Sequence, residues 1–286
     1  MRVKPAQVNS LLRIPFLPIQ FFKSHRVVCG QFEPEVVFES SGTTQTINSR
    51  HEVKDADIYQ RSYLTCFEQF YGPVSDYVVL GLLPSYLERK SSSLVHMVQD
   101  MIARSGQPES GFYLYEHDKL KSTLEALEAQ GRKVLLIGVT FGLLDFATNY
   151  ELQLKNTIVM ETGGMKGRRE EWTREEVHAY LKDRLGVQQV HAEYGMTELL
   201  SQAYSLADSR FHTPAWMKVL VRDENDPFQL FERSAPGVIN VVDLANIYSC
   251  AFIATEDIGR LQADGSFAVL GRLDNSALRG CSLMVS

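Results

Sequence analysis

The sequence has no long apolar run and no recognisable targeting segment. Across 286 residues no stretch of about 18 or more consecutive apolar residues occurs, which excludes an ordinary membrane-spanning helix. The amino-terminal segment is interrupted by Arg13, Pro15 and Pro18 and has no small-residue cleavage site. We therefore expect neither a signal peptide nor a membrane span.

Cysteine and metal-binding motifs are also scarce. The four cysteines are widely spaced, with no C-x-x-C pair, and no H-E-x-x-H motif occurs among the seven histidines. This usage favours a reducing, cytoplasmic compartment over a disulfide framework or a zinc site. The cysteines are Cys29, Cys66, Cys250 and Cys281.

The charge balance excludes a general attraction to polyanions. The formal net charge is -6, so we expect no nucleic-acid partner. An apolar share of 44% and a charged share of 22% are typical of a globular protein. No internal repeat is evident.

Apolar runs and amphipathic segments alternate between residues 76 and 195. This order is typical of an α/β fold with a mainly parallel sheet and helices on both faces. Thr173 and Glu176 have capping-box spacing, and Gly106, Gly131 and Gly186 mark helix ends. The pattern predicts strands over 76–84, 132–140, 156–164 and 187–195, and helices over 57–71, 93–106, 119–131, 141–152 and 173–186.

The pattern changes after residue 212, where short apolar strands follow one another without helices. We therefore predict an α/β core over residues 1–212 and a smaller β-rich lobe over residues 213–286.

A hydroxyl-rich segment near the start is the first candidate site. A glycine among serines and threonines suits a loop whose amides and hydroxyls contact phosphate. The segment is not a Walker A motif, and by itself it also fits an ordinary serine/threonine turn. Its residues are Ser40, Ser41, Gly42, Thr43 and Thr44.

Three further motifs follow predicted strands. Thr197 and Glu198, after Tyr194 and Gly195, suit phosphate contact and Mg²⁺ binding at the start of a predicted helix, or simple helix capping. Asp257, placed after a strand, suits the hydroxyls of a ribose.

The fourth motif, G-R-x-D, contributes Arg272, which suits a ribose or a phosphate. Taken singly, Asp257 and Arg272 also fit a turn aspartate and a surface arginine. The order S-S-G-T-T, Y-G-M-T-E, T-E-D and G-R-x-D resembles the adenylate-forming superfamily, which includes acyl-CoA synthetases, peptide-synthetase adenylation domains and luciferase-like enzymes.

The sequence is more similar to the acyl-protein synthetases of the LuxE type. The stretches that carry this resemblance span nearly the whole chain: IPFLPIQFFKSHRV, SSGTTQTINSRH, LLPSYLERKSSSLVHMV, ETGGMKGRREEWTREE, EYGMTELLSQAY and LRGCSLMV. The resemblance implies an AMP-forming acid–thiol ligase that uses ATP and Mg²⁺ to activate a fatty or other carboxylic acid. It also implies transfer of the acyl group through an enzyme cysteine, for which Cys281 is our candidate, and an acyl-acceptor protein as partner.

The resemblance also predicts roles for the candidate residues. Glu198 would hold Mg²⁺, Asp257 and Arg272 the ribose, and Tyr194 would stack on adenine. Gly163 and Gly164 would allow close approach of the nucleotide, with Lys166 and Arg168 near phosphate or carboxylate; a solvated loop opening a helix is the alternative. For Cys281 the alternative is an inert cysteine in an apolar strand.

The chain departs from the superfamily pattern in two respects. Asn48 stands where the phosphate loop usually carries lysine, a charge that Arg50 would replace. The usual mobile C-terminal domain, with its catalytic lysine, is expected to be lacking, so Lys23, Lys166, Arg168 or Arg169 would supply that cation. His51 and His212 are expected in loops near the site, in surface or packing roles.

Two other functions stay open at this stage. The chain could form an acyl-CoA or aryl-CoA instead, in which case CoA would be consumed without a need for Cys281. It could also be a catalytically weakened nucleotide-binding partner module, which Asn48 favours and the retained Thr197, Glu198, Asp257 and Arg272 oppose.

Overall fold

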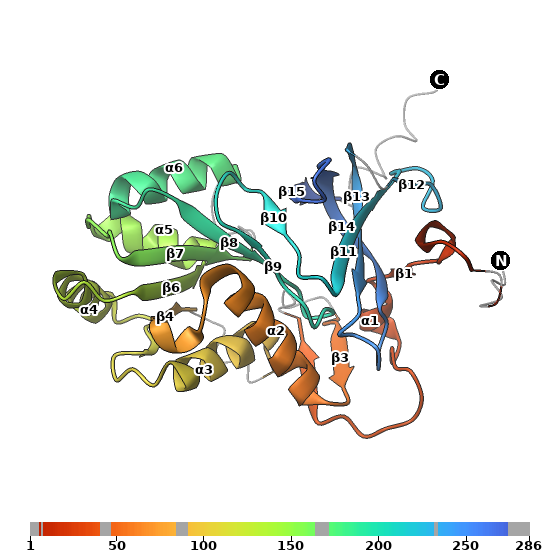
Figure 1. The fold of residues 1–286 in the computed structure, drawn as a ribbon, viewed down its shortest axis with the longest axis horizontal. Helices are drawn as coiled ribbons and strands as arrows, with labels where there is room; N and C mark the ends of the chain where they lie inside the picture. The colour runs from red at the N-terminus through yellow and green to blue at the C-terminus, as the bar shows by residue number, and fades with distance from the viewer. Residues whose placement is uncertain are drawn as a thin grey trace.

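The computed structural model describes residue 6 and residues 8–40, 47–83, 91–163, 172–231 and 234–273. Most of the strands in this part of the chain join one 13-stranded sheet, and the longer helices pack on one half of it (Figure 1). The fold is therefore mixed α/β, as the alternation in the sequence predicts.

One half of the large sheet is parallel. In spatial order its strands are β5 (Gly111–Phe112), β4 (Val78–Leu82), β6 (Val134–Val139), β7 (Thr157–Thr162) and β8 (Val190–Tyr194). The last four correspond to the four strands predicted from apolar runs. Their carboxyl ends therefore meet at one edge, which is where ligands bind in sheets of this kind.

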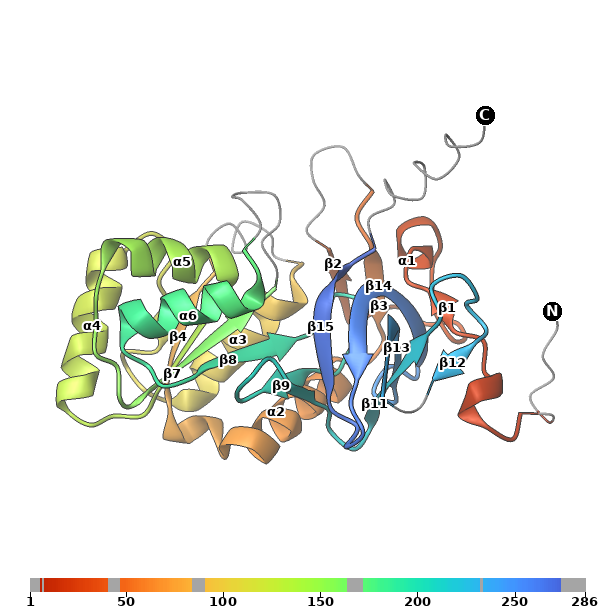
Figure 2. The same cartoon turned by 90° about the horizontal axis from the view of Figure 1, so that it is seen from above.

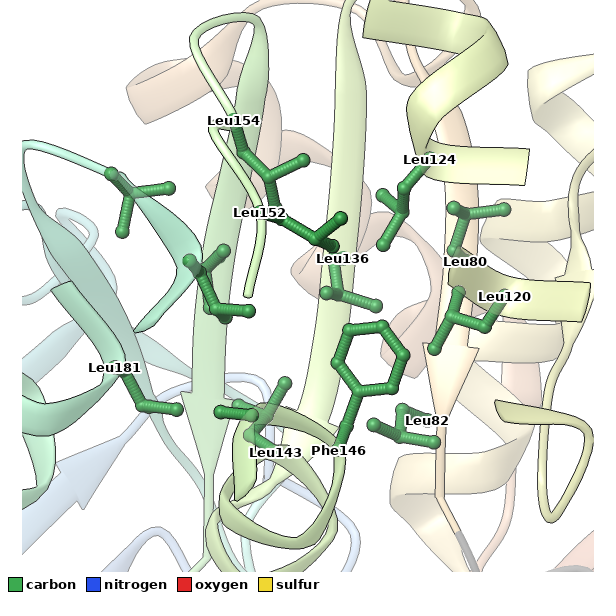
Figure 3. Packing of buried hydrophobic residues seen from close by; sticks show 14 of the residues in the cluster. Leu80, Leu82, Leu120, Leu124, Leu136, Leu143, Phe146, Leu152, Leu154 and Leu181 are labelled. Atoms are coloured by element: carbon green, nitrogen blue, oxygen red, sulfur yellow. The ribbon is translucent and has the colours of Figure 1, made fainter. Parts of the chain in front are cut away.

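Helices cover both faces of this parallel half. Leu80 and Leu136 pack with α4 (His117–Ala129), α5 (Thr140–Asn149) and α6 (Arg174–Leu185), as Figure 3 shows for part of the cluster. The intervening residues Val79 and Leu135 pack on the other face, with α2 (Ala56–Tyr71) and α3 (Ser93–Ser105). Because strand side chains alternate between faces, continuous apolar strands require helices on both sides. The predicted arrangement is confirmed.

The helix boundaries follow the signals in the sequence. Thr173 and Glu176 form the predicted capping box at the start of α6, and Gly186 ends that helix with a positive φ of 66°. The left-handed backbone at this position favours glycine over residues with a Cβ.

The other half of the large sheet is antiparallel. Its strands, in spatial order from β8, are β9 (Ala203–Ser205), β10 (Phe211–His212), β15 (Phe267–Arg272), β14 (Phe252–Leu261), β13 (Ala235–Asp243), β11 (Met217–Arg222) and β12 (Leu230–Phe231). Figure 2 shows these strands at the end of the molecule opposite α4. The direction changes between β8 and β9, inside one continuous sheet; the division at residues 212 and 213 stays a prediction.

Short elements complete the described chain. The strands β2 (Val36–Glu39) and β3 (Arg50–Val53) pair antiparallel in a separate two-stranded sheet, and β1 (Leu17–Pro18) pairs with β14. The short helices are η2 (Leu11–Arg13), α1 (Phe21–Ser24) and η3 (Val74–Asp76). No helix in the described ranges is long and apolar enough to cross a bilayer.

Candidate functional site

The hairpin of β2 and β3 holds Ser40, the first residue of the hydroxyl-rich segment. The amide of Ser40 donates to the Ser49 carbonyl at 3.1 Å, and the Ser49 amide donates to the Ser40 hydroxyl at 2.9 Å. Arg50 pairs in register with Glu39, and their side chains lie 3.8 Å apart. The other members of the segment lie outside the described residues: Ser41, Gly42, Thr43 and Thr44.

The segment after β8 is a turn, and the helix predicted to begin at Thr197 and Glu198 is wrong. Residues 195–202, here called the Thr-Glu turn, connect β8 directly to the antiparallel strand β9. Side chains from elsewhere satisfy its backbone: Asp243 accepts from the Leu200 amide at 2.8 Å, and Asn246 donates to the Glu198 carbonyl at 2.8 Å. A helix is not needed to satisfy these groups.

His51 is a third anchor of the Thr-Glu turn. It lies within β3 and not in a loop, is fully buried, and places Nδ1 2.8 Å from the Thr197 carbonyl oxygen. Its Nε2 lies 3.0 Å from the Asn246 side-chain oxygen. A buried histidine of this kind gave no signal in the sequence, because its partners are 146 and 195 residues away along the chain.

Glu198 is a buried carboxyl group beside positive charge. It is 6% exposed, and burial raises its pKa, opposed by a hydrogen bond from Ser49 and by the charges of Arg272 and Lys23. This contact places Ser49, at the start of β3 and bonded to Ser40, against the Thr-Glu turn. Two residues that are about 150 positions apart in the sequence therefore lie close together.

Asp257, Tyr194 and Arg272 form the other side of this site. The Tyr194 hydroxyl donates to Asp257 Oδ2 at 2.8 Å, and Arg272 Nε lies 3.8 Å from Asp257 Oδ1. Burial raises the pKa of Asp257, while the Tyr194 hydrogen bond and the charge of Arg272 oppose that shift. Asp257 lies inside β14, directly opposite Arg272 of β15, and not after a strand as predicted. The strand continues because residues 257–261 remain paired with β15.

The Tyr194 ring belongs to the core. It is 7% exposed, and its ring centroid lies 5.9 Å from that of Phe211 and 5.3 Å from that of Phe267. The predicted stacking on adenine does not fit this packing, because the ring presents little free surface. What Tyr194 offers the site is its hydroxyl, which fixes Asp257.

Two glycines at this edge are required by geometry. A Cβ on Gly195 would lie 2.4 Å from the Glu193 carboxylate, so a larger residue would displace that buried group. Gly163, directly after β7, has a φ of 76°, and its carbonyl accepts from the Thr140 hydroxyl at 3.4 Å. Gly195 is therefore required by a close approach to Glu193, and Gly163 by its positive φ.

Behind Gly163 lies a polar cluster that sequence reasoning missed. Thr140 donates to Glu161 at 2.6 Å, and Arg174 Nε lies 2.8 Å from the other oxygen of Glu161, with His178 Nε2 at 3.6 Å. Burial by itself would raise the pKa of Glu161. The hydrogen bonds and charges of these partners lower the pKa by more, so it lies below its usual value. The Arg174 charge also acts on Asp257. The cluster therefore links α6 to Asp257.

Of the remaining predicted residues, one lies within the described part of the chain and the others lie outside it. Lys23, in α1, acts electrostatically on Glu198. The rest lie outside the described residues: Gly164, Lys166, Arg168, Arg169 and Cys281. Within the described ranges no group of three or more histidine, cysteine, aspartate or glutamate side chains is arranged to hold a metal ion.

Solved structures with the same fold are adenylate-forming enzymes. ATP-bound MatB from Rhodopseudomonas palustris matches with a TM-score of 0.61 and 16% identity, covering 85% of this chain and 49% of that one. MenE from Bacillus subtilis in complex with AMP matches at 0.56 and 16%, covering 82% and 49%. FadD1, a long-chain-fatty-acid-CoA ligase from Archaeoglobus fulgidus, matches at 0.56 and 12%, covering 86% and 53%.

These matches define the class of fold, and the chain spans about half the length of the structures it matches. No curated protein sequence matches the chain significantly. The sequence model of the LuxE acyl-protein synthetases matches residues 107–286, which is more than half of the chain. The chain therefore belongs to the LuxE acyl-protein synthetase family, and the resemblance noted from its motifs is confirmed.

Proposed function

We propose that this chain activates a carboxylic acid with ATP as an acyl-adenylate and passes the acyl group to a protein thiol. The observation that carries the proposal is the meeting of Ser40, Ser49 and Glu198 with Asp257 and Arg272 at one edge of the sheet. The family and the fold of the neighbouring enzymes support the same chemistry.

In the proposed reaction a carboxylate oxygen forms a bond to the α-phosphorus of ATP, and the bond to pyrophosphate breaks. Both reactants are anionic, so their repulsion must be lowered. Arg272 and Lys23 are the described cations whose charges reach Glu198. Arg50 and Lys166 are the further candidates named from the sequence, and the hydroxyl-rich segment would supply neutral donors.

Glu198 is the residue we propose to hold Mg²⁺. Magnesium in nucleotide enzymes is commonly bound by one or two carboxylates together with substrate phosphates, so a single buried carboxylate fits this use. Burial raises the pKa of Glu198, so its ionised form is undercompensated without a bound cation. When bound, the ion would neutralise phosphate charge.

On the ribose side we propose that Asp257 accepts hydrogen bonds from the hydroxyls and that Arg272 supports it. Gly163, Gly164 and Gly195 would let the nucleotide approach the backbone. The Tyr194 hydroxyl would keep Asp257 in place through the 2.8 Å hydrogen bond.

Replacing Tyr194 with phenylalanine is expected to raise the KM for ATP about ten-fold, with a smaller change in kcat. A hydrogen bond to a charged group contributes about 1.5–3 kcal/mol, and its loss frees the Asp257 carboxylate to move. Tyr150→Phe is a matched control, because the Tyr150 hydroxyl donates to Asp118 at 2.7 Å on the exposed surface. Steady-state AMP formation measures both variants, and an unchanged KM in Tyr194→Phe would contradict the ribose role of Asp257.

For the second half-reaction we propose that the Cys281 thiolate attacks the acyl carbon, which forms a thioester and releases AMP. A fatty acid is the proposed substrate, consistent with the family description and with the long-chain-fatty-acid-CoA ligase among the structural neighbours. The proposed acceptor is a partner protein, and the proposed compartment is the cytoplasm, where Cys29, Cys66 and Cys250 would remain free thiols.

The thioester has a direct test. The wild-type protein, ATP, Mg²⁺ and a labelled fatty acid are expected to give a hydroxylamine-labile acyl-protein, and Cys281→Ser is expected to abolish the label while acid-dependent ATP–pyrophosphate exchange continues. Cys250→Ser serves as the matched control. Label retained in Cys281→Ser would overturn the assignment of this cysteine. Label absent from the wild-type protein, with acyl-CoA formed when CoA is added, would favour the CoA-ligase alternative.

A further inference from the structure

Two buried side chains, from residues outside the Thr-Glu turn, contact the backbone carbonyls of this turn. His51 Nδ1 lies 2.8 Å from the Thr197 carbonyl, and Asn246 Nδ2 donates to the Glu198 carbonyl at 2.8 Å. The two side chains also meet, with His51 Nε2 3.0 Å from Asn246 Oδ1. Together they form a continuous chain of contacts across two successive peptide groups.

Water cannot take over these contacts in the folded protein. Both His51 and Asn246 are 0% exposed, and the ring of Phe22 closes over His51 with its centroid 5.5 Å away. Removing Asn246 would leave the buried Glu198 carbonyl without its donor, and removing His51 would leave the partly buried Thr197 carbonyl without its partner. The turn therefore depends on this pair for its observed path.

The two side chains come from different parts of the chain. His51 lies on β3, two residues after Ser49, whose hydroxyl bonds Glu198. Asn246 follows β13 and lies in the turn that leads to β14, the strand of Asp257. The pair thus joins β3, the Thr-Glu turn and the turn that leads to the strand of Asp257.

We propose that His51 and Asn246 are positioning residues that set where the Glu198 carboxylate stands relative to Ser49 and Arg272. This inference rests on the proposed function. Neither side chain touches the carboxylate; each fixes a carbonyl of the backbone that carries it. Glu198 is therefore held through the backbone on both sides of its Cα, by His51 at the Thr197 carbonyl and by Asn246 at its own carbonyl.

The first test compares Asn246→Ala with Asn240→Ala. Asn240 is also fully buried and bonds Arg222 on β11, away from the Thr-Glu turn, so its loss reproduces the cost of deleting a buried amide. Asn246→Ala is expected to raise the Mg²⁺ concentration that half-saturates ATP–pyrophosphate exchange by about ten-fold or more, because loss of an outer-shell partner of a metal ligand has effects of this size. Asn240→Ala is expected to leave that concentration unchanged.

The second readout needs no nucleotide. Amide hydrogen exchange of residues 195–202 is expected to be faster in Asn246→Ala than in Asn240→Ala or the wild-type protein. If Asn246→Ala does not fold, the isosteric Asn246→Asp removes the same donor. For His51, the replacement His51→Asn keeps a donor near the position of Nδ1. It is therefore expected to raise the half-saturating Mg²⁺ concentration less than His51→Leu does.

The outcomes separate this inference from the proposed function. The positioning role alone would be overturned if the wild-type protein catalyses ATP–pyrophosphate exchange and this exchange has the same Mg²⁺ dependence in Asn246→Ala and Asn240→Ala. Equal amide exchange of the turn in both variants would also overturn it. No exchange in the wild-type protein with any acid would overturn the proposed function, and with it this role in catalysis.

Discussion

Replacing Glu198 with glutamine is expected to lower acid-dependent ATP–pyrophosphate exchange by about 100-fold or more while the protein remains folded. The side chain is 6% exposed and its pKa is raised by burial, so a neutral amide avoids the cost of burying charge. Because the amide is neutral, it can neither bind Mg²⁺ as proposed for Glu198 nor balance the charge of Arg272. Loss of one electrostatic contact to a reacting group has an effect of about this size.

The matched control for this variant is Glu151→Gln, the same chemical change at a carboxylate that is 69% exposed and pairs with Arg184 at the surface. Thermal unfolding of both variants reports on the fold. Exchange in Glu198→Gln within a few fold of the wild-type rate, at saturating Mg²⁺, would remove Glu198 from the proposed machinery.

Replacing Glu193 with glutamine is expected to remove a pH dependence of stability. Burial is the main cause that raises the pKa of Glu193 from 4.5 to about 7, with a further contribution from the charge of Glu161 and an opposing hydrogen bond from Thr162. Because the folded pKa lies above the unfolded one, the protonated form favours folding. This contribution is complete below the unfolded pKa and is lost as the pH rises through about 7.

The expected size is about 3 kcal/mol, since one pKa unit corresponds to about 1.36 kcal/mol. Urea unfolding of the wild-type protein and Glu193→Gln at acidic and mildly alkaline pH measures it. The stability of the wild-type protein relative to the variant is expected to fall between the two conditions. A constant difference, or one that rises with pH, would contradict a pKa of Glu193 raised to about 7 in the folded protein.

The sequence predicted the parallel half of the fold well, because its signals are local. Strands such as Val134–Val139 are buried on both faces and read as continuous apolar runs. The helix that begins after Thr173 carries its own capping box and its own terminating glycine. Interactions within a few residues suffice to specify such elements.

The Thr-Glu turn was mispredicted for the opposite reason. Thr197 and Glu198 are residues favoured at a helix start, but the local preference is overridden by Asp243, Asn246 and His51. These partners are separated from the turn by 43, 48 and 146 residues, so no window along the sequence could reveal them. Tertiary hydrogen bonds decided the backbone path there.

In the candidate site, too, some residues were predictable from motifs, whereas others depend on contacts between distant parts of the chain. The motif order pointed to Ser40, Glu198, Asp257 and Arg272, and the fold brings these residues to one region. The resemblance assigned Tyr194 to adenine, whereas its ring packs in the core against Phe211 of β10 and Phe267 of β15. Arg174 belongs to no motif that signals its role, so its ion pair with Glu161 became visible only in the folded chain.

The measurement that tests this account most directly is carboxylate-dependent exchange of labelled pyrophosphate into ATP by the wild-type protein, with Mg²⁺ and a panel of fatty and aryl acids. We predict exchange that requires an acid, favours fatty acids and falls with Glu198→Gln. Measurable ATP binding without exchange for any acid would contradict acyl activation by this chain alone and would favour the nucleotide-binding module.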